Sequence, residues 1–229
     1  MVTVEGLRDS PVRHDWSMAD TRVARTGPGR PAGSDSFDTR QRVIEAGCRC
    51  FAQHGYGAAT NSLIAEMAGV TAGSVYYHFG AKRKLFEAVC TYVYGNIVTR
   101  ARAAMAGAHT VPELLRAILT ESIRINHESP ELAGFVAAAP VDARRHTELT
   151  EIFAQQTEGM RSSLAEAVMT GQQGGHIPAD ADPLLVAGMI SAVVDGFAHA
   201  AASVDAAALD AMTQLFDALI LTGEAGTGS

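Results

Sequence analysis

The stretch from Thr60 to Phe79 reads TNSLIAEMAGVTAGSVYYHF and decides the fold. Thr60 has a suitable side chain to cap a short helix over 62–68, because its hydroxyl can accept a hydrogen bond from a backbone N–H of the first turn. Gly69 can adopt the left-handed conformation that a tight turn needs. Thr71 then caps a second short helix, which continues to Phe79. Two short helices joined by such a turn are typical of the helix-turn-helix motif.

The second helix of this stretch has two different faces. Val75 and Phe79 are four residues apart on the same side, which predicts that they pack on the core. Gly73, Ser74 and Tyr77 fall on the opposite side at about 100° per residue. This exposed face fits a major groove, and the free N–H groups at the start of the helix can hold a phosphate.

Helical periodicity continues through the rest of the chain, and no useful stretch alternates with the period of two that strands show. Prolines 112, 130 and 183 fall in first turns of the expected helices, where the missing N–H does no harm. The sequence therefore predicts an all-α fold with about nine helices. The expected ranges are 38–54, 62–68, 72–79, 82–107, 112–127, 130–139, 142–173, 183–202 and 206–222.

Composition divides the chain into four regions. Residues 1–36 combine proline, glycine and scattered charges without a hydrophobic period, which predicts a disordered tail. Residues 37–90 are expected to form a three-helix DNA-binding domain around the motif at 60–79, and residues 91–223 a larger helical domain. Residues 224–229 are again expected to be disordered.

Charge is distributed unevenly between these regions. The net charge of −7 combines six basic and four acidic side chains in residues 37–90 with seven basic and sixteen acidic ones in residues 91–229. A mildly basic unit joined to an acidic one suits a protein that meets a polyanion at one end.

Several classes of protein are excluded by composition. The longest strongly apolar run without a charge, Pro183 to Val194, has 12 residues, fewer than the ~18 that a membrane helix needs. No apolar segment near the N-terminus indicates a secretory signal. Cys48 and Cys50 point in different directions on a helix, which argues with Cys90 against a disulfide scaffold or a zinc cluster. We expect a cytoplasmic protein with no membrane partner, no metal and no cofactor.

Residues 64–85, IAEMAGVTAGSVYYHFGAKRKL, together with residues 42–56, RVIEAGCRCFAQHGY, resemble the signature of TetR-type transcriptional regulators. The resemblance covers residues 38–90 densely. It implies a homodimeric, ligand-responsive repressor with its reading head at the N-terminus, with 91–223 as the ligand-binding and dimerisation domain. The partners it implies are an inverted-repeat operator in double-stranded DNA and a small molecule.

The resemblance also assigns DNA contacts to particular residues. Thr60, Tyr76 and Lys82 are expected on phosphates, and hydroxyl and ammonium groups are common phosphate partners. Residues expected at bases or nearby backbone are Ala72, Gly73, Ser74, Tyr77 and His78. Asn61 is a supplementary candidate, and Thr71 belongs to the phosphate-holding helix start. His78 is equally compatible with packing.

The predicted reading helix contains no Arg, Lys, Asn or Gln between Thr71 and Phe79, so bidentate base readout is missing. This favours contact of Ala72 with thymine methyl groups and some readout of DNA shape. Arg30, in the Gly-Arg-Pro sequence of the tail, is a candidate to enter a narrow A·T minor groove. An ordinary disordered tail is the alternative.

The larger domain has two expected functions. The last two helices, 183–202 and 206–222, are apolar enough to form a four-helix interface between two copies, although a core within one chain is the alternative. A cavity for a small hydrophobic effector is expected between the reading head and this interface. Its tentative lining residues are Met105, Ile123, His127, Phe135, Phe153 and Met160.

Two other classes of function remain as alternatives. A protein-binding module could use the same fold without DNA. An enzyme is the weakest alternative, because the sequence lacks G-x-S-x-G, H-E-x-x-H and phosphate-loop motifs and offers no catalytic residues.

Overall fold

The computed structural model describes residues 32–201, 206–216 and 218, and within them every regular element is a helix. The all-α expectation is confirmed for this part of the chain. The α-helices are α1 (Ala32–Ala58), α2 (Asn61–Ala68), α3 (Ala72–Phe79), α4 (Lys82–Met105), α5 (Val111–Glu128), α6 (Pro130–Arg145), α7 (Thr150–Gln173), α8 (Pro183–Ala201) and α9 (Ala206–Phe216), with a short 3-10 helix, η1 (Thr147–Leu149), between α6 and α7.

The first helix is longer than predicted. α1 begins at Ala32, so residues 32–36 continue the helix and do not belong to a disordered tail. No proline lies between Ala32 and Asp38, and a single glycine there costs only about 1 kcal/mol. Residues 1–31, with Arg30, and residues 224–229 lie outside the described residues.

The helix-turn-helix has the predicted caps. The Thr60 hydroxyl accepts a hydrogen bond from the backbone N–H of Leu63, and the Thr71 hydroxyl accepts one from Ser74, both at 3.1 Å. Gly69 closes α2 with a φ of 64°, in the left-handed region that favours glycine. Local side-chain chemistry therefore fixes both ends of the turn.

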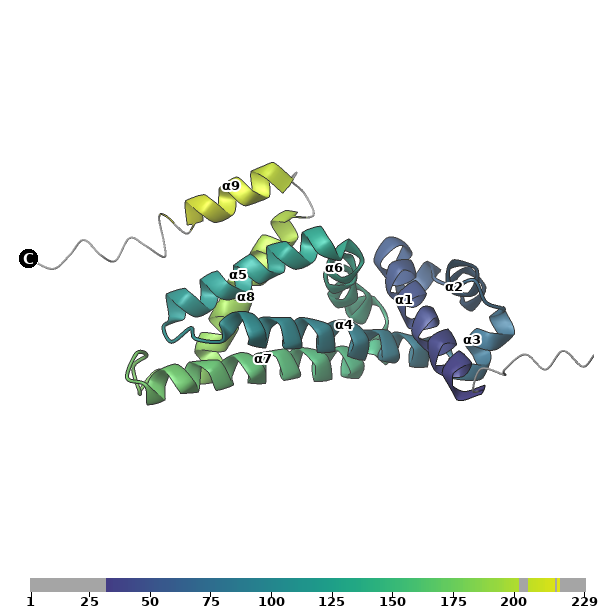
Figure 1. Ribbon diagram of the computed structural model, residues 1–229, viewed down its shortest axis with the longest axis horizontal. Coiled ribbons are helices and arrows are strands. Elements are labelled where there is room, and N and C mark those ends of the chain that lie inside the picture. Colours follow the sequence, from purple (N-terminus) through teal and green to yellow (C-terminus); the bar gives the residue numbers. More distant parts are fainter. Residues whose placement is uncertain (1–31, 202–205, 217, 219–229) are drawn as a thin grey trace, which may run out of the picture.

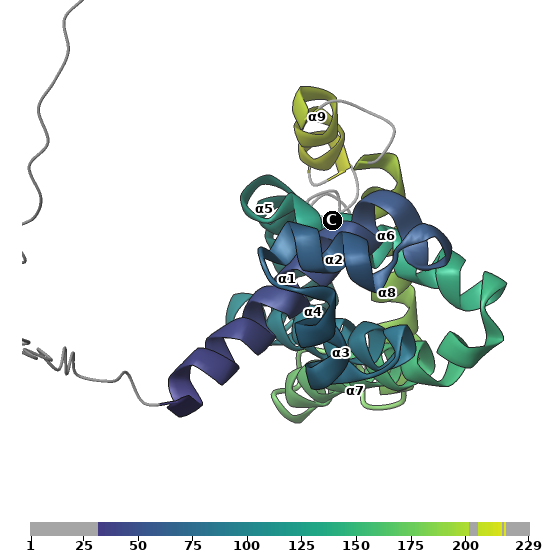
Figure 2. The ribbon, with the colours of Figure 1, turned by 90° about the vertical axis from the view of Figure 1, so that its right-hand side faces the viewer.

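The helix-turn-helix stands at one end of an elongated molecule (Figure 1). α1, α2 and α3 form this end, and α4 leads from it into the second half, where α7 runs beside α4 and α5 lies on its other side. The end-on view shows α1, α2 and α3 grouped around the start of α4 (Figure 2). Because α4 belongs to both halves, the predicted boundary at residue 90 falls inside a helix.

Buried side chains form two clusters. In the first, the rings of Phe51, Phe86 and Phe135 lie 5.2–6.4 Å apart, and they bring α1, α4 and α6 together. The second cluster includes Leu119 of α5, Val168 of α7 and further apolar residues of α4 and α8. The first cluster joins the helix-turn-helix to the start of the larger half, so the two halves share a core.

The break between α6 and α7 differs from the prediction. The sequence predicted a break at Pro140, whereas α6 continues through this proline to Arg145 and the chain turns at 146–149. Pro in a helix interior costs about 3 kcal/mol. The turns around it are held by burial of Ala139 and Ala143 and by the buried carboxylate of Asp142. Long-range packing here outweighs the local preference of proline.

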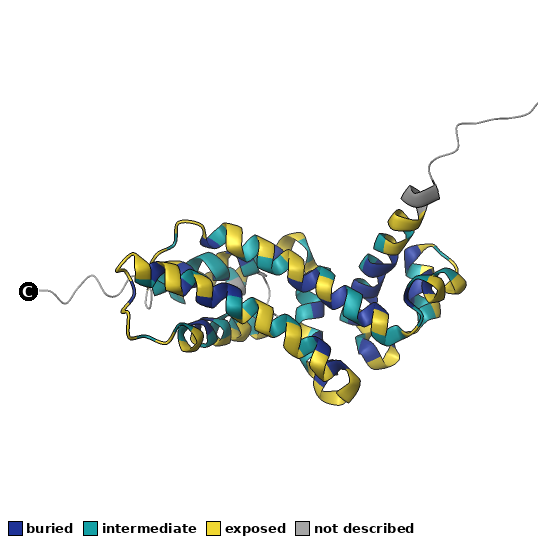
Figure 3. Cartoon of the chain, turned by 90° about the horizontal axis from the view of Figure 1, so that it is seen from below, coloured by how far each residue is buried: buried dark blue, intermediate teal, exposed yellow. Residues whose placement is uncertain are grey.

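α8 turns an apolar face outward. Leu185 is 74% exposed and Met189 52%, and on α9 Leu215 is 58% exposed. Exposed residues also follow the outer sides of the long helices in Figure 3. Among the described residues, Pro183–Ala200 is one helix long and apolar enough to cross a membrane, with only 11% of its window buried. The short length of the uncharged run from Pro183 to Val194 therefore does not by itself exclude a membrane segment. Nevertheless, Ala187 and Ile190 of this helix are fully buried against the second cluster.

Candidate nucleic-acid interface and ligand cavity

α3 presents two exposed aromatic side chains on a firmly packed helix. Val75 is fully buried and Phe79 nearly so, as their four-residue spacing predicted. On the other side, Tyr76 is 69% and Tyr77 83% exposed, so neither ring contributes the stabilising free energy that burial of its apolar surface would give. A helix anchored on one face and aromatic on the other is suited to bind a partner through Tyr76 and Tyr77.

The other candidates on α3 surround these two tyrosines. Thr71, Ala72 and Gly73 are exposed at the start of the helix, and Ser74 is half-buried. His78 is also half-buried, with its ring 5.2 Å from that of Tyr77 and 6.2 Å from that of Phe79. His78 thus packs between its neighbours and also helps to orient Tyr77.

The candidates on α2 differ from each other. Thr60 is exposed and already accepts the Leu63 N–H, which leaves its hydroxyl proton free to donate. Asn61 is half-buried, and its Oδ1 is buried without a hydrogen-bond partner among the described residues. In this conformation Asn61 can offer a DNA base only its amide N–H groups.

Lys82 has a different environment from the one predicted. Its ammonium donates to the backbone carbonyls of Tyr56 at 2.7 Å and Ala59 at 2.9 Å, with Gly57 at 3.4 Å. The same ammonium lies 4.4 Å from the centroid of the Tyr56 ring. Because an ammonium has three N–H donors, these contacts satisfy it. Lys82 therefore ties the start of α4 to the end of α1, and its expected phosphate contact stays a prediction.

Other basic residues of this half also serve the fold, which sequence reasoning missed. Arg42 donates through Nη2 to the carbonyls of Ala68 at 2.5 Å and Gly69 at 3.1 Å, so it holds the turn of the motif. The Arg40 guanidinium lies 5.3 Å from the centroid of the Phe79 ring. Both arginines remain exposed at the surface, and no short-range pattern would have revealed these contacts.

The second half contains a cavity of about 310 Å³ between α4, α5, α6, α7 and α8. Met105, Ile123 and Met160 line it, as predicted. The lining residues are Ile97, Val98, Ala101, Met105, Ile118, Leu119, Glu121, Ser122, Ile123, Ile125, Asn126, Pro130, Ala133, Gly134, Val136, Ala137, Met160, Ser163, Leu164, Ile190, Ser191, Val194, Asp195, Phe197 and Ala198.

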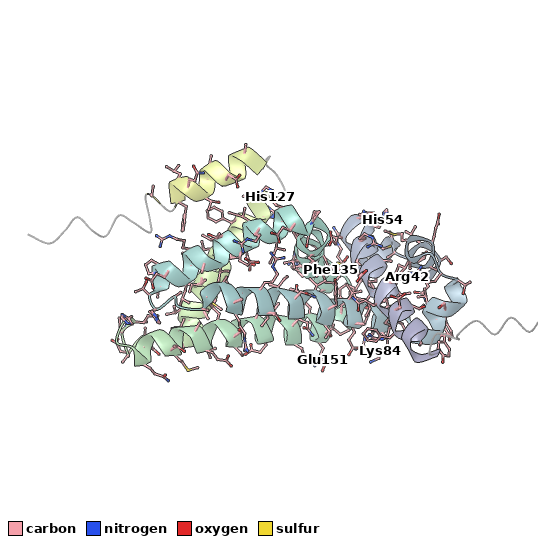
Figure 4. The ribbon with its side chains drawn as sticks, in the orientation of Figure 1. Arg42, His54, Lys84, His127, Phe135 and Glu151 are labelled. Atoms are coloured by element: carbon pink, nitrogen blue, oxygen red, sulfur yellow. The ribbon has the colours of Figure 1, made fainter. Side chains whose placement is uncertain are left out.

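The other three predicted lining residues lie elsewhere. Phe135 is fully buried where α6 meets α1 (Figure 4), because it packs on the ring of Phe86. Phe153 packs against Tyr94, with 6.2 Å between ring centroids. His127 lies between α5 and α9 with its Nε2 3.9 Å from a carboxylate oxygen of Asp210, so it faces outward from the cavity.

α6 connects the cavity with the helix-turn-helix. Ala133 and Gly134 line the cavity, and a Cβ at Gly134 would lie 3.2 Å from the Cβ of Ala52 on α1. Further along α6, Asp142 Oδ2 accepts a hydrogen bond of 2.8 Å from the backbone N–H of Tyr56. A rigid shift of α6 would therefore affect both the wall of the cavity and the contact with Tyr56.

Further contacts close the junction around Tyr56. Its ring stacks edge-on against that of His146, 5.0 Å away. Arg83 at the start of α4 donates to the carbonyl of Glu148 in η1 at 3.1 Å. The end of α6, η1 and the start of α4 are thus linked to one another and to the last turn of α1.

Comparison with known proteins agrees with this geometry. Residues 43–89 match the family model "Bacterial regulatory proteins, tetR family", and residues 112–222 match "BetI-type transcriptional repressor, C-terminal". The HTH-type transcriptional repressor AcnR of Corynebacterium glutamicum is 26% identical over 72% of this chain and 83% of its own length.

Two solved structures extend the comparison. The fatty acid degradation regulator FadR from Bacillus halodurans is 25% identical with a TM-score of 0.67, over 82% of this chain and 96% of its own. SmeT, the repressor of a multidrug efflux pump of Stenotrophomonas maltophilia, has been solved in complex with triclosan. Its chain is 25% identical to this one with a TM-score of 0.60, over 72% of this chain and 80% of its own.

Proposed function

Because this chain is a DNA-binding transcriptional regulator of the TetR family of bacterial regulatory proteins, we propose that it acts as a homodimeric repressor. Its operator is an inverted repeat, and a small, largely apolar ligand controls its release from that operator. The observation that carries the proposal is the exposed pair Tyr76 and Tyr77 on a helix whose opposite face is buried. The relatives are transcriptional regulators, and we place this protein in the cytoplasm without a catalytic role.

DNA reading is assigned to α3. We propose that Tyr77 and Ser74 read base edges, that Tyr76 binds a phosphate, and that Thr71 and the N–H groups of Ala72 and Gly73 hold a second phosphate at the helix start. Hydroxyl groups and helix N-termini are frequent phosphate partners. Lys82 contributes indirectly, because it positions α4 against the motif.

Dimerisation is assigned to the exposed faces of α8 and α9. Leu185, Met189 and Leu215 would otherwise leave large apolar side chains in water, and such side chains exposed near one another are typical of an interface. A two-fold axis would pair α8 and α9 of one copy with those of the other, and would set the two α3 helices for two half-sites. A second copy that covers α8 would thus account for the low burial of this helix, and no membrane is needed to explain it.

Ligand control is assigned to the cavity beside α6. Its walls are mostly aliphatic, and the related SmeT has been solved with triclosan, which supports a cavity for a small molecule here. A ligand that displaces α6 would pull Asp142 away from Tyr56, and one that displaces α4 would move Lys82. Both motions change the angle of α3 and the separation of the two reading helices.

A gel shift with the DNA upstream of the protein's own gene tests this function. We expect a complex that survives excess random DNA and that Tyr77→Ala removes. A protein-binding module of the same fold would leave the DNA unshifted, as would an enzyme, and either result would overturn the proposal.

A further inference from the structure

Two polar side chains of α5 line the cavity without a hydrogen-bond partner. Ser122 and Asn126 are four residues apart, so they lie on the same side of the helix. Both are half-buried, and neither makes a hydrogen bond through its side chain to any of the described residues. Because polar groups inside a protein are normally hydrogen-bonded, two unpaired ones on a cavity wall are suited to bind the polar group of a ligand.

The charged groups of the lining offer a ligand no counter-ion inside the cavity. Glu121 already accepts from Arg100 Nε at 2.5 Å on one oxygen and from Arg124 Nη1 at 3.1 Å on the other. Asp195 is exposed, so its carboxylate is solvated by water. The described lining contains no Lys, Arg or His. An ionised group would lose its hydration here without a charged partner in return, so the cavity suits an uncharged polar group.

The carboxamide of Asn126 determines which uncharged group is the best match. It presents N–H donors and a carbonyl acceptor side by side. A ligand amide whose N–H and C=O lie on the same edge, as in a lactam, offers the complementary pair and can form two hydrogen bonds with it. A ketone offers only an acceptor and can form one, which leaves the carbonyl of Asn126 unpaired.

Resting on the proposed function, we propose that the effector carries an amide or lactam group on an apolar body, and that Asn126 binds this group with the Ser122 hydroxyl beside it. Aliphatic side chains of three other helices or turns of the lining, among them Ile118, Leu164 and Ile190, would hold the body. The loss of a matched hydrogen bond in a partly dry site is costly, so the amide selects the ligand.

α6 supplies small side chains to the same cavity. Ala133, Gly134 and Ala137 line it and leave room for the body of a ligand. Gly134 is also the position where α6 approaches Ala52 of α1. A ligand anchored through Asn126 therefore has room to lie against the helix that connects the cavity with the helix-turn-helix.

Three probes with the same phenyl-substituted ring test this inference on the full-length protein at pH 7. They are the lactam 4-phenylpiperidin-2-one, the ketone 3-phenylcyclohexanone, which lacks the N–H, and 4-phenylpiperidine, an amine that is protonated at this pH. In calorimetry we expect the lactam to bind at least about tenfold more tightly than the ketone, and more tightly than the amine. Equal affinity of lactam and ketone, tightest binding of the amine, or no binding of any probe overturns the proposal.

Asn126→Leu then locates the effect, because leucine has a similar size and no polar group. It should remove the preference for the lactam and leave the affinity for the ketone nearly unchanged. Asn96→Leu is the matched control, the same change at an exposed position of α4 outside the cavity lining, and should keep the preference. A preference that survives in Asn126→Leu overturns the role of Asn126. If circular dichroism shows that Asn126→Leu does not fold, Asn126→Ala replaces it with the same expectation, since alanine favours helices.

Operator binding separates this inference from the proposed function. If the lactam binds through Asn126 but does not release DNA, ligand control fails and the recognition of the amide stands. If the ketone binds and releases DNA as well as the lactam does, ligand control stands and the recognition of the amide fails.

Discussion

Asp142 and Tyr56, 86 positions apart in the sequence, are joined by a hydrogen bond of 2.8 Å from the Tyr56 backbone N–H to a buried carboxylate oxygen. The bond links the end of α6 to the last turn of α1, and α6 also lines the cavity. We therefore regard it as the link through which occupancy of the cavity reaches the reading helix.

The Asp142 bond has a measurable strength. Asp142→Ala should lower the free energy of unfolding by about 1–3 kcal/mol, because it leaves a buried N–H without an acceptor. Asp142→Asn keeps an acceptor oxygen and should cost less. Urea unfolding measures both, and equal stability of Asp142→Ala and the wild type would show that the bond contributes nothing.

Lys82 is predicted to act on stability more than on phosphate. Lys82→Ala should lower the free energy of unfolding by about 1–3 kcal/mol and leave the salt dependence of DNA binding unchanged. Lys84→Ala is the matched control, since that side chain is 61% exposed and pairs only with Glu87. A salt slope reduced by ~0.9 per subunit in Lys82→Ala would instead support the phosphate contact that the sequence predicts.

Tyr77 is predicted to affect recognition and not folding. Tyr77→Ala should change the free energy of unfolding by less than about 0.5 kcal/mol, because the ring is exposed. It should reduce the preference for operator over random DNA by roughly 1–3 kcal/mol. Fluorescence anisotropy on both DNAs is the measurement, and an equal loss on the two would argue against base reading by Tyr77.

The apolar surface of α8 is predicted to hold the dimer. Leu185→Glu should yield monomers in analytical ultracentrifugation without loss of helical content, since its side chain contributes little to the core of one chain. Met169→Glu, on an exposed position of α7, should remain dimeric. Dimers of Leu185→Glu at micromolar concentration would place the interface elsewhere.

The buried thiols predict a dependence on high pH. Burial raises the pKa of Cys48 and of Cys90 from 9.0 to about 12. Between these pH values the two thiols ionise in the unfolded chain but not in the folded one. Their contribution to the free energy of unfolding is therefore fully present below pH 9.0 and is lost as the pH rises towards about 12. Replacement of both cysteines by Ala should flatten this decline in urea unfolding. The native thiols should also resist Ellman's reagent at pH 8 until the protein unfolds.

Local chemistry explains which features the sequence could predict. The hydroxyls of Thr60 and Thr71 and the left-handed Gly69 act within three residues, so the caps and the turn could be identified from neighbouring letters. The buried and exposed sides of α3 followed from helical spacing alone.

Long-range contacts explain what the sequence could not predict. Lys82 and Arg42 bond to carbonyls more than twenty positions away, and Asp142 keeps α6 helical beyond Pro140. The cavity lining depends on how helices cross, so Met105, Ile123 and Met160 line the cavity while Phe135 and Phe153, equally apolar, pack elsewhere.

Hydroxyl-radical footprinting of the full-length protein on the DNA upstream of its own gene tests the central claim most directly. Two reading helices related by a two-fold axis predict two symmetric protected blocks whose centres are at least ~10 bp apart, both lost in Tyr77→Ala. A single asymmetric block, or protection that Tyr77→Ala leaves intact, would contradict a dimer that reads an inverted repeat through α3.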